Sequence, residues 1–505
     1  MKLSLAIALG LVFPLAACRQ PAVERSVTTT TAAAVSSSAP ALELAPSARQ
    51  PGGCDTLTDV ESPDTLRLAR ADGSVVLYAN EQVGLAVVDV RDPDQPKMVG
   101  LVELVGEPAG VFEVRGLGVV VYSPADRAGI TAVRAVDIGS VVRTVGELSF
   151  VGHVRDARRV GDFLVITRDT PDGRTAVTSL AITERGITLR DEVVLGGAGS
   201  VTGASPRGLV VARAAAKDAG PDRTSVTWLG MDADLGMFSV RGSTTFSGVI
   251  PRWRSSRRVL DVTEDDRARF VTCATSACDF SAPAAYASID FSTPNEPRLT
   301  AWNLVAGAGD GVIGFQGTRL VVARPSEDRS DASEVAFYRT EKDLVPAGRV
   351  RVRGSVGTVA VRDSGDIVTV GWTGSASAGK RAILHHIDAR GEPRLVGAAT
   401  FGGDWTWTRA YDDDRVIGFD PQSMLAALPM TTVRGDLGPT SAAQVLSLDT
   451  TGTHAIAEET VSLADRLLFV KGRLLAFSPD GVVVLRRESE PGSELRWDPL
   501  RSRGR

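Results

Sequence analysis

Short apolar runs, each cut off by turn residues, recur along most of the chain. Runs such as 111–114 (VFEV) and 119–122 (VVVY) are rich in valine, and glycine or proline follows within two residues. Short β-branched and aromatic runs bounded by such residues are typical of β-strands. The one Ala-rich stretch that could compete as a helix, residues 212–219, ends in Gly-Pro. The pattern therefore predicts an all-β protein.

A longer repeat groups these strands. Residues 84–100 (GLAVVDVRDPDQPKMVG) align without gaps with residues 289–301 (IDFSTPNEPRLTA), so that Asp89 falls on Asp290. Residues 387–397 (IDARGEPRLVG) repeat the pattern with two residues deleted. Weaker copies are centred on Asp137, Leu180, Leu229, Tyr338 and Asp449. Successive copies lie about 43 to 61 residues apart.

Each repeat predicts four strands, with the third strand ending at the aspartate position and the fourth following a turn. Four strands in 40 to 50 residues is the spacing of propeller blades. We therefore expect a single β-propeller over residues 54–490, with about eight four-stranded blades. Seven and nine are the alternatives, because the last strands, at 467–487, either complete a blade or begin another. Pairing of the two chain ends is expected to close the ring.

The repeats also resemble known families. GLAVVDVRDP and IDFSTPNEP resemble the LVIVD-type repeats of secreted bacterial β-propellers. Residues 399–430, with Arg415-Val-Ile-Gly-Phe-Asp and Met424-Leu-Ala-Ala-Leu-Pro, resemble a secreted C-terminal β-propeller family distantly related to tryptophan–aspartate repeats. The resemblance implies the fold and a secreted location, and it implies no particular chemistry.

The N-terminus predicts a lipoprotein. Met1-Lys2 and the apolar run 3–13 are typical of a signal peptide, and Leu15-Ala16-Ala17-Cys18 resembles a bacterial lipobox. Residues 1–17 would then be cleaved and Cys18 would carry the lipid; the alternative is an ordinary signal with a chance cysteine. Residues 18–53 are rich in Ser, Thr, Ala and Pro, which predicts a disordered tether. We expect anchoring in the cell envelope, in the outer membrane if the host is Gram-negative. Residues 491–505 form a C-terminal tail.

Charge and cysteine content narrow the partners. The net charge of −5, without a basic stripe, argues against nucleic acid. An oxidising compartment favours a Cys273–Cys278 disulfide, with Cys54 bonded to one of them as the alternative. The four histidines have no metal-ligand spacing, so no metal or cofactor is predicted.

Two regions are candidates for binding. Trp405 and Trp407 should share one strand face, with Tyr411 further along it, which would suit stacking on a sugar or a partner's side chain; blade packing is the alternative. Residues 251–285 interrupt the repeat and contain Trp253 and Arg254, and insertions in propellers collect on the rims. The alternative for this insertion is a solvated excursion.

Three further features are weaker candidates. The acidic runs 264–266 and 412–414 could hold calcium, although each is expected in a solvated turn. His385 and His386 should point to opposite faces of one strand, one buried and one solvated.

These observations predict a non-catalytic, membrane-tethered binding or scaffold lipoprotein that contacts protein or glycan through a propeller face. One alternative is an envelope assembly factor similar to the propeller lipoprotein of the barrel-assembly machine. Another is a hydrolase or lyase with its site in the central channel. Three or more titratable side chains converging on the channel would favour the enzyme, whereas a rim patch of aromatic residues and arginines would favour binding.

Overall fold

The computed structural model describes residues 60–61, 68–71, 74–139, 141–205, 208–215, 222–250, 259–263, 265–275, 283–305, 312–325, 331–341, 343–362, 365–375, 379–403, 405–411, 413–420, 422–433, 438–449, 452–461, 464–485 and 494–496. Cys18, Cys54, Cys278, Trp253 and Arg254 lie outside the described residues.

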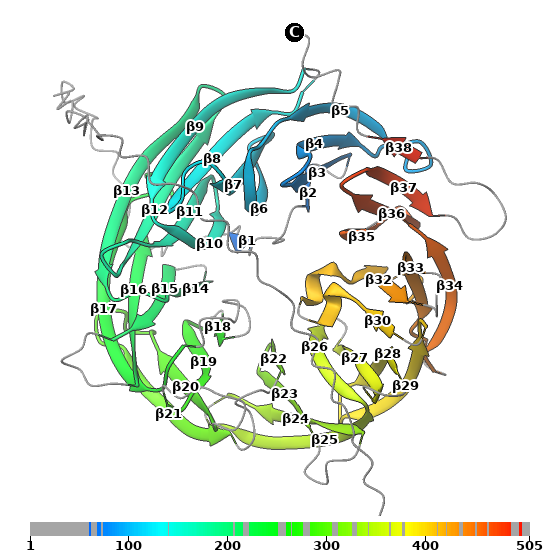
Figure 1. Cartoon of the computed structure of the whole chain (residues 1–505). Coiled ribbons are helices and arrows are strands. Elements are labelled where there is room, and N and C mark those ends of the chain that lie inside the picture. The colour runs from blue at the N-terminus through cyan, green and yellow to red at the C-terminus, as the bar shows by residue number, and fades with distance from the viewer. Residues whose placement is uncertain are drawn as a thin grey trace, which may run out of the picture. The chain divides into compact units, whose positions relative to one another are not determined.

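The described strands form a ring of nine blades around a central opening, and each blade contains a four-stranded antiparallel meander (Figure 1). Blade three has a fifth, short strand, β1 (Val60–Glu61), which pairs with the first strand of its meander. The first three blades contain β2 (Leu68–Ala71), β3 (Val75–Asn80), β4 (Gly84–Asp89) and β5 (Lys97–Val102); β6 (Gly106–Val114), β7 (Leu117–Pro124), β8 (Ile130–Asp137) and β9 (Arg143–Val151); β10 (His153–Val160), β11 (Phe163–Asp169), β12 (Arg174–Thr183) and β13 (Gly186–Gly196).

The next three blades follow the same order. They contain β14 (Val201–Ser205), β15 (Gly208–Ala214), β16 (Arg223–Met231) and β17 (Phe238–Ser247); β18 (Leu260–Val262), β19 (Arg267–Cys273), β20 (Ala284–Asp290) and β21 (Arg298–Val305); β22 (Val312–Gln316), β23 (Arg319–Pro325), β24 (Ala332–Arg339) and β25 (Val345–Arg353).

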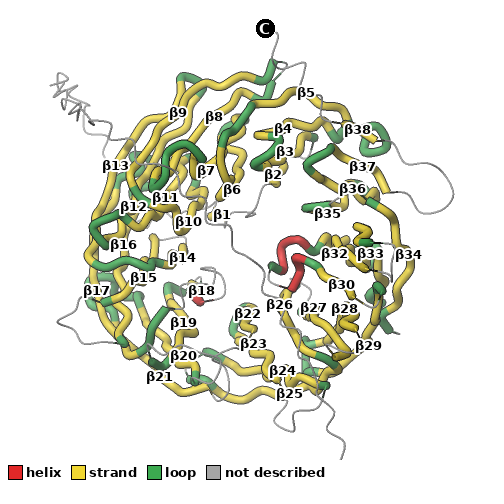
Figure 2. The backbone as a smooth tube through the Cα atoms, in the orientation of Figure 1, coloured by secondary structure: helices red, strands yellow, loops and turns green. Residues whose placement is uncertain are grey.

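Blades seven and eight are joined into one sheet by an extra strand, β30 (Trp405–Trp407). The last three blades contain β26 (Ser355–Val361), β27 (Asp366–Ser375), β28 (Gly379–Asp388) and β29 (Arg394–Phe401); β31 (Gly418–Asp420), β32 (Leu425–Val433), β33 (Pro439–Ser447) and β34 (His454–Thr460); β35 (Arg466–Val470), β36 (Arg473–Ser478), β37 (Gly481–Leu485) and β38 (Glu494–Arg496). Two 3-10 turns, η2 (Arg409–Tyr411) and η3 (Asp414–Val416), project toward the ring centre (Figure 2).

The predicted β-propeller is confirmed. The described strands form nine blades, which is one of the two alternatives to the expected eight. The residues that define the eight repeat copies all fall in or just after the third strand of blades one to eight: Asp89 ends β4, Asp290 ends β20 and Asp388 ends β28. The ninth blade has no equivalent aspartate, because its third strand ends in Leu485 and an arginine follows. The repeat therefore underestimates the number of blades by one.

Blades stack through a bulge that the sequence reading missed. In each of blades one to eight the register shifts between the third and fourth strands. The fourth-strand residue beside the shift is small in seven of the eight blades, and the residues are Gly100, Gly146, Asp191, Gly242, Ala301, Gly348, Gly397 and Ala457. A β-carbon at Gly242 would lie 2.4 Å from the Pro294 carbonyl oxygen of blade five, which is far too close. The small residue thus lets the turn of the next blade pack against this strand.

The ring closes without exchange of strands among those described. Blade one and blade nine each keep their own four strands, so the expected pairing of the chain ends is wrong for the described residues. Instead, Tyr78 packs on Phe477 with ring centroids 5.5 Å apart, and the Tyr78 hydroxyl donates to Asp465 over 2.9 Å. Asn80 donates to the same carboxylate over 2.7 Å. The two blades therefore meet as neighbouring blades do elsewhere, through buried side chains.

Candidate functional site

The strand β30 is an insertion in the propeller plan. It lies between the third strand of blade seven and the second strand of blade eight, parallel to β28 at Lys380–Trp405 and antiparallel to β32. Gly402, with a φ of +83°, turns the chain out of β29 toward this position. Because β30 has a partner on each side, its side chains are held in fixed directions.

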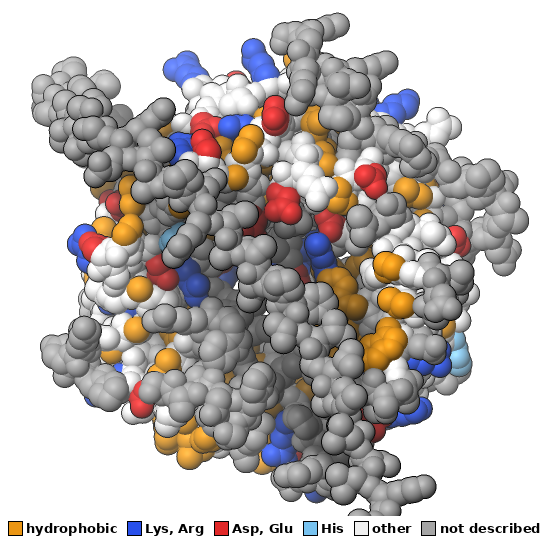
Figure 3. Space-filling view, viewed as in Figure 1, with side chains coloured by type: hydrophobic (Ala, Val, Ile, Leu, Met, Phe, Trp, Pro, Cys, Tyr) orange, Lys and Arg blue, Asp and Glu red, His pale blue; other side chains and the backbone are white. Residues whose placement is uncertain are grey.

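Alternation along β30 puts both indoles on one face. Trp405 is 45% exposed and Trp407 is 52% exposed, whereas the Thr406 side chain between them is buried. The Thr406 hydroxyl donates to the Gly403 carbonyl over 3.2 Å and lies 3.2 Å from the Thr432 hydroxyl. Hydrophobic side chains gather over this part of the ring in Figure 3. The predicted shared face of the two tryptophans is what the structure has.

Tyr411 contributes from a different position than predicted. It is not further along the same strand, because the chain leaves β30 at Thr408 and turns into η2, where Tyr411 is buried. Its hydroxyl donates to the Thr406 carbonyl over 3.1 Å, and its ring meets Trp372 edge-on with centroids 5.2 Å apart. Burial raises the pKa of the Tyr411 hydroxyl well above its ordinary value, so this group stays neutral. Tyr411 therefore supports the site from behind.

These residues enclose a pocket of about 430 Å³, called here the aromatic pocket. It is lined by Trp372, Lys380, Trp405, Thr406, Trp407, Tyr411, Thr431 and Val433. Sequence reasoning missed Trp372 and Lys380, which come from blade seven about 25 to 35 residues earlier. Only the pairing of β30 with β28 brings them to the tryptophans, and no local pattern in the sequence reports that pairing.

The aromatic pocket carries one cation. The Lys380 ammonium lies 5.4 Å from the centroid of the Trp372 ring, within the range of a cation–π contact. Among the residues that the structure describes, no carboxylate pairs with Lys380. The pocket is otherwise mainly apolar, with threonine hydroxyls as its other polar groups. Such a site suits a ligand with a flat or apolar face and a few hydroxyl or anionic groups.

The two neighbouring histidines do not form a site. Both His385 and His386 are buried, so the expected solvated partner is wrong, because both faces of β28 pack against neighbouring blades. His385 Nδ1 lies 2.9 Å from the Thr369 hydroxyl, and burial lowers its pKa to about 4. His386 Nε2 lies 3.5 Å from Asp366, and burial lowers its pKa despite that carboxylate. Both are therefore neutral packing groups at pH 7.

The acidic runs are used by the protein itself. The buried Asp266 accepts a hydrogen bond from the Ser205 hydroxyl over 3.0 Å. Asp413 caps η3 and pairs with Arg415 over 2.6 Å; burial alone would raise its pKa, but Arg415 and Arg466 bring it below the ordinary value. The described residues contain no group of three or more His, Cys, Asp or Glu side chains that could hold a metal ion.

Cys273 ends β19 and is disulfide-bonded. The other cysteines lie outside the described residues, so the pairing of Cys273 with Cys278 stays a prediction. Trp253 and Arg254, in the 251–285 insertion, also stay predictions.

Charged side chains do meet near the ring centre. Asp156 and Arg158, on β10 of blade three, pair over 2.8 Å, and Arg158 donates to the Thr202 carbonyl of blade four over 2.6 Å. Burial raises the pKa of Asp156, and the charges of Arg158 and of Arg415, on η3, offset part of that rise. The described residues thus include a buried charged cluster on the inner side of the ring and an aromatic patch whose cation is Lys380 rather than an arginine.

Comparisons with known proteins add little beyond this geometry. No protein-family model and no curated protein matches the chain. Among solved structures it is similar to Saccharomyces cerevisiae Sqt1, with 10% identity over 79% of this chain and 97% of that chain and a TM-score of 0.44. It is also similar to the WD40 domain of fission yeast SCAP, with 9% identity over 85% and 91% and a TM-score of 0.39. A third is the β-propeller domain of the Trilobed protease from Pyrococcus furiosus, with 10% identity over 71% and 99% and a TM-score of 0.35. The functional argument therefore rests on the aromatic pocket.

Proposed function

We propose that this protein is a non-catalytic binding lipoprotein of the cell envelope and that the aromatic pocket holds a sugar residue of a glycan. The observation that carries the proposal is the pair of exposed indoles on the rigid strand β30. The C–H groups on one face of a sugar ring are apolar and slightly positive, so they stack on the negative face of an aromatic ring. Lys380 and the threonine hydroxyls would then bond ring substituents.

The glycan part is tested by intrinsic tryptophan fluorescence, with the mature protein titrated with a panel of neutral and uronate oligosaccharides. We expect saturable quenching with at least one of them, weakened about tenfold or more by Trp405→Ala or Trp407→Ala. Trp302→Ala is the matched control: Trp302 is also exposed, but its indole donates to the Ser247 carbonyl in another blade. Quenching by no oligosaccharide, or quenching that both pocket variants preserve, would overturn the proposal.

The tether part rests on residues 15–18 and the Ser/Thr/Ala/Pro-rich segment after them. We expect the wild type to incorporate labelled palmitate and to fractionate with membranes. Cys18→Ala should remove the label and release the protein or leave it unprocessed. Absence of label on the wild type would exclude lipidation. No helix among the described residues is long and apolar enough to span a membrane.

A second candidate function is a hydrolase or lyase in the channel, and the cluster of Asp156, Arg158 and Arg415 supports it. A carboxyl group with a raised pKa beside two guanidinium groups could act as an acid near a bound anion. Asp156→Asn should then abolish turnover of any glycan that the pocket binds. Binding without turnover in the wild type would reject this candidate and leave the binding function standing.

A further inference from the structure

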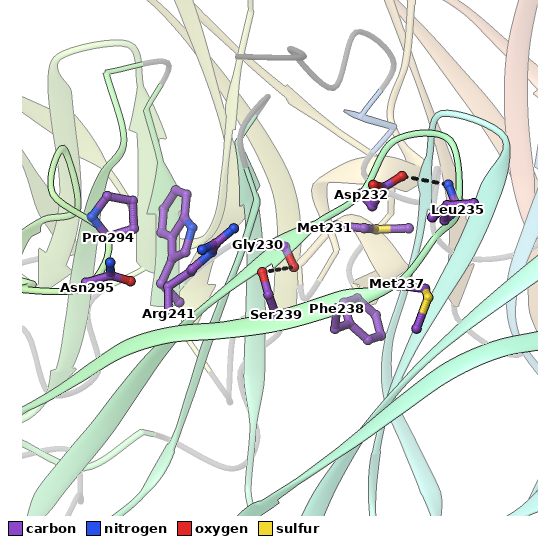
Figure 4. Close-up of a pocket in the computed structure, with 11 residues that line it drawn as sticks. Gly230, Met231, Asp232, Leu235, Met237, Phe238, Ser239, Arg241, Pro294 and Asn295 are labelled. Carbon is purple, nitrogen blue, oxygen red and sulfur yellow. Dashed lines mark hydrogen bonds between the residues drawn. The ribbon is translucent and has the colours of Figure 1, made fainter. Parts of the chain in front are cut away.

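A second pocket lies at the other side of the ring, between blades four and five. It is called here the arginine pocket, has a volume of about 560 Å³, and is lined by residues of the 228–241 hairpin and by Pro294 and Asn295 (Figure 4). Its walls are held in place. Asp232 accepts hydrogen bonds from the backbone of Asp234 and Leu235 over 2.9 and 2.7 Å, which fixes the turn after β16.

The neighbouring blades brace both walls of this pocket. Gly236, with a φ of +71°, sits against Phe163 of blade three, and the Phe238 amide donates to Asp191 of the same blade over 2.7 Å. On the other side, the turn that carries Pro294 and Asn295 packs on Gly242. The pocket is therefore preformed, so a ligand would not need to order it first.

The polar group that distinguishes the pocket is Arg241. Its guanidinium lies across Gly230, where an added β-carbon would come within 3.1 Å of Nε, and Asn295 faces it across the pocket (Figure 4). No hydrogen bond or ion pair joins Arg241 to any residue that the structure describes. By contrast, Arg349, on the equivalent strand of blade six, lies 3.4 Å from Glu334. Among the described residues, Arg241 is thus a planar donor without an acceptor.

Apolar side chains line the end of the pocket opposite Arg241 (Figure 4). Leu235 is 58% exposed and Met237 is 50% exposed. Asp232 also lines the pocket, but its carboxylate already accepts the two turn amides. A guanidinium at one end of the pocket and exposed aliphatic groups at the other fit a ligand that has a carboxylate at one end and an apolar side chain at the other.

We propose that the arginine pocket is a protein-binding site that takes an extended peptide segment, with an acidic side chain on Arg241 and, two residues away on the same face of the peptide, a leucine-like side chain on Leu235 and Met237. Asn295, with one amide donor and one acceptor face, would bond the peptide backbone. β17 is the outermost strand of blade four among those described, so an extended segment can lie along its edge. This site is independent of the aromatic pocket and adds a protein partner to the proposed glycan.

The test uses synthetic peptides and the mature protein. The probe is N-acetyl-Thr-Glu-Thr-Leu-Thr-amide with a fluorescent label, read by anisotropy. The comparison peptides replace its glutamate by glutamine or its leucine by alanine, and free propionate tests for capture of any small carboxylate. We expect the parent peptide to bind, and each replacement to weaken binding about tenfold or more.

Variants of the protein locate the site. Arg241→Ala should weaken binding about tenfold to a hundredfold, and Arg241→Lys should lie between it and the wild type, because lysine keeps the charge and loses the two-pronged geometry. Gly230→Ala, which displaces the guanidinium without changing charge, should also weaken binding. Arg349→Ala is the control and should bind like the wild type. Four outcomes would overturn the proposal. The glutamate and glutamine peptides could bind equally, Arg349→Ala could weaken binding as much as Arg241→Ala, propionate could compete at the same concentration as the peptide, or no peptide could bind.

Discussion

The two pockets lie at seams between blades, yet they are built in different ways. The arginine pocket uses parts that every blade has, a hairpin turn after the third strand and the turn of the next blade. The aromatic pocket needs β30, which has no counterpart elsewhere among the described strands. The comparison indicates that a propeller gains a site either by changing side chains on its repeating turns or by inserting a new strand into a seam.

The cations of the two pockets are held differently as well. Lys380 lies over the Trp372 ring, which supplies an electron-rich partner, whereas Arg241 lies over Gly230, which supplies none. The aromatic pocket is thus already organised around its own cation. The arginine pocket depends on a ligand for the acceptor, so its cation should matter more for binding than for stability.

The largest expected effect is the loss of the support behind the aromatic pocket. Tyr411→Ala removes a buried ring that packs on Trp372, and we expect it to destabilise the fold by about 4 kcal/mol. Tyr411→Phe keeps the ring and loses the hydrogen bond to Thr406, so it should cost about 1 kcal/mol. Denaturant unfolding measures both. Equal stability of the alanine variant and the wild type would mean that Tyr411 does not support β30.

Tyr411 also shows how much of the aromatic pocket could be predicted from the sequence. Spacing alone placed Trp405 and Trp407 on one face, because alternation along a strand is local. It misplaced Tyr411, because nothing in residues 408–411 reveals that the chain leaves the strand. It could not reach Trp372 and Lys380 either, because their position depends on which strand β30 pairs with. Likewise, Arg241 has no sequence signature, since its lack of a partner is a property of the seam.

The second effect is a pH dependence confined to the aromatic side of the ring. Burial lowers the pKa of His385 from its ordinary value of about 6.5 to about 4, so this side chain is neutral in the folded protein at pH 7. Between pH 4 and pH 6.5 this histidine binds more protons in the unfolded chain than in the folded protein. The stability of the folded protein is therefore fully present above pH 6.5 and falls as the pH drops toward 4. The loss should reach about 3 kcal/mol, an order-of-magnitude figure from the shift.

Hydrogen exchange at pH 7 and pH 4.5 measures where this loss acts. Protection should fall in blades six and seven and hold in blade four, which contains no histidine. His385→Leu should remove most of the difference, and the rest should follow His386, whose pKa is lowered in the same direction. A uniform loss of protection around the ring would contradict the assignment.

A third effect tests the bulge packing that occurs at the seams of both pockets. Gly242, beside the arginine pocket, and Gly397, in blade seven, occupy the same bulge position, and a β-carbon would lie 2.4 Å from Pro294 O and 2.5 Å from Thr453 N respectively. Gly242→Val and Gly397→Val should each cost about 2 kcal/mol, because the neighbouring turn must move. Thermal unfolding measures this. Ala301→Gly, at a bulge position that already holds a side chain, is the control and should change stability by less. If either valine variant were neutral, the bulge would not set the blade spacing.

The smallest effect on stability separates binding residues from packing residues in both pockets. Trp407 is 52% exposed, and the Arg241 side chain has no described partner, so Trp407→Ala and Arg241→Ala should each change the free energy of unfolding by less than about 0.5 kcal/mol. The same two variants are expected to lose binding of their respective ligands about tenfold or more. Trp302→Ala sharpens the contrast, because its indole bonds Ser247 across a seam, and it should cost stability without affecting either ligand. Denaturant unfolding and the two binding assays on the same preparations give the answer. A destabilised Trp407→Ala protein would mean that the exposed indoles contribute to packing between the blades. The aromatic pocket would then be a packing gap between blades seven and eight, and the arginine pocket would be the better candidate for a binding site.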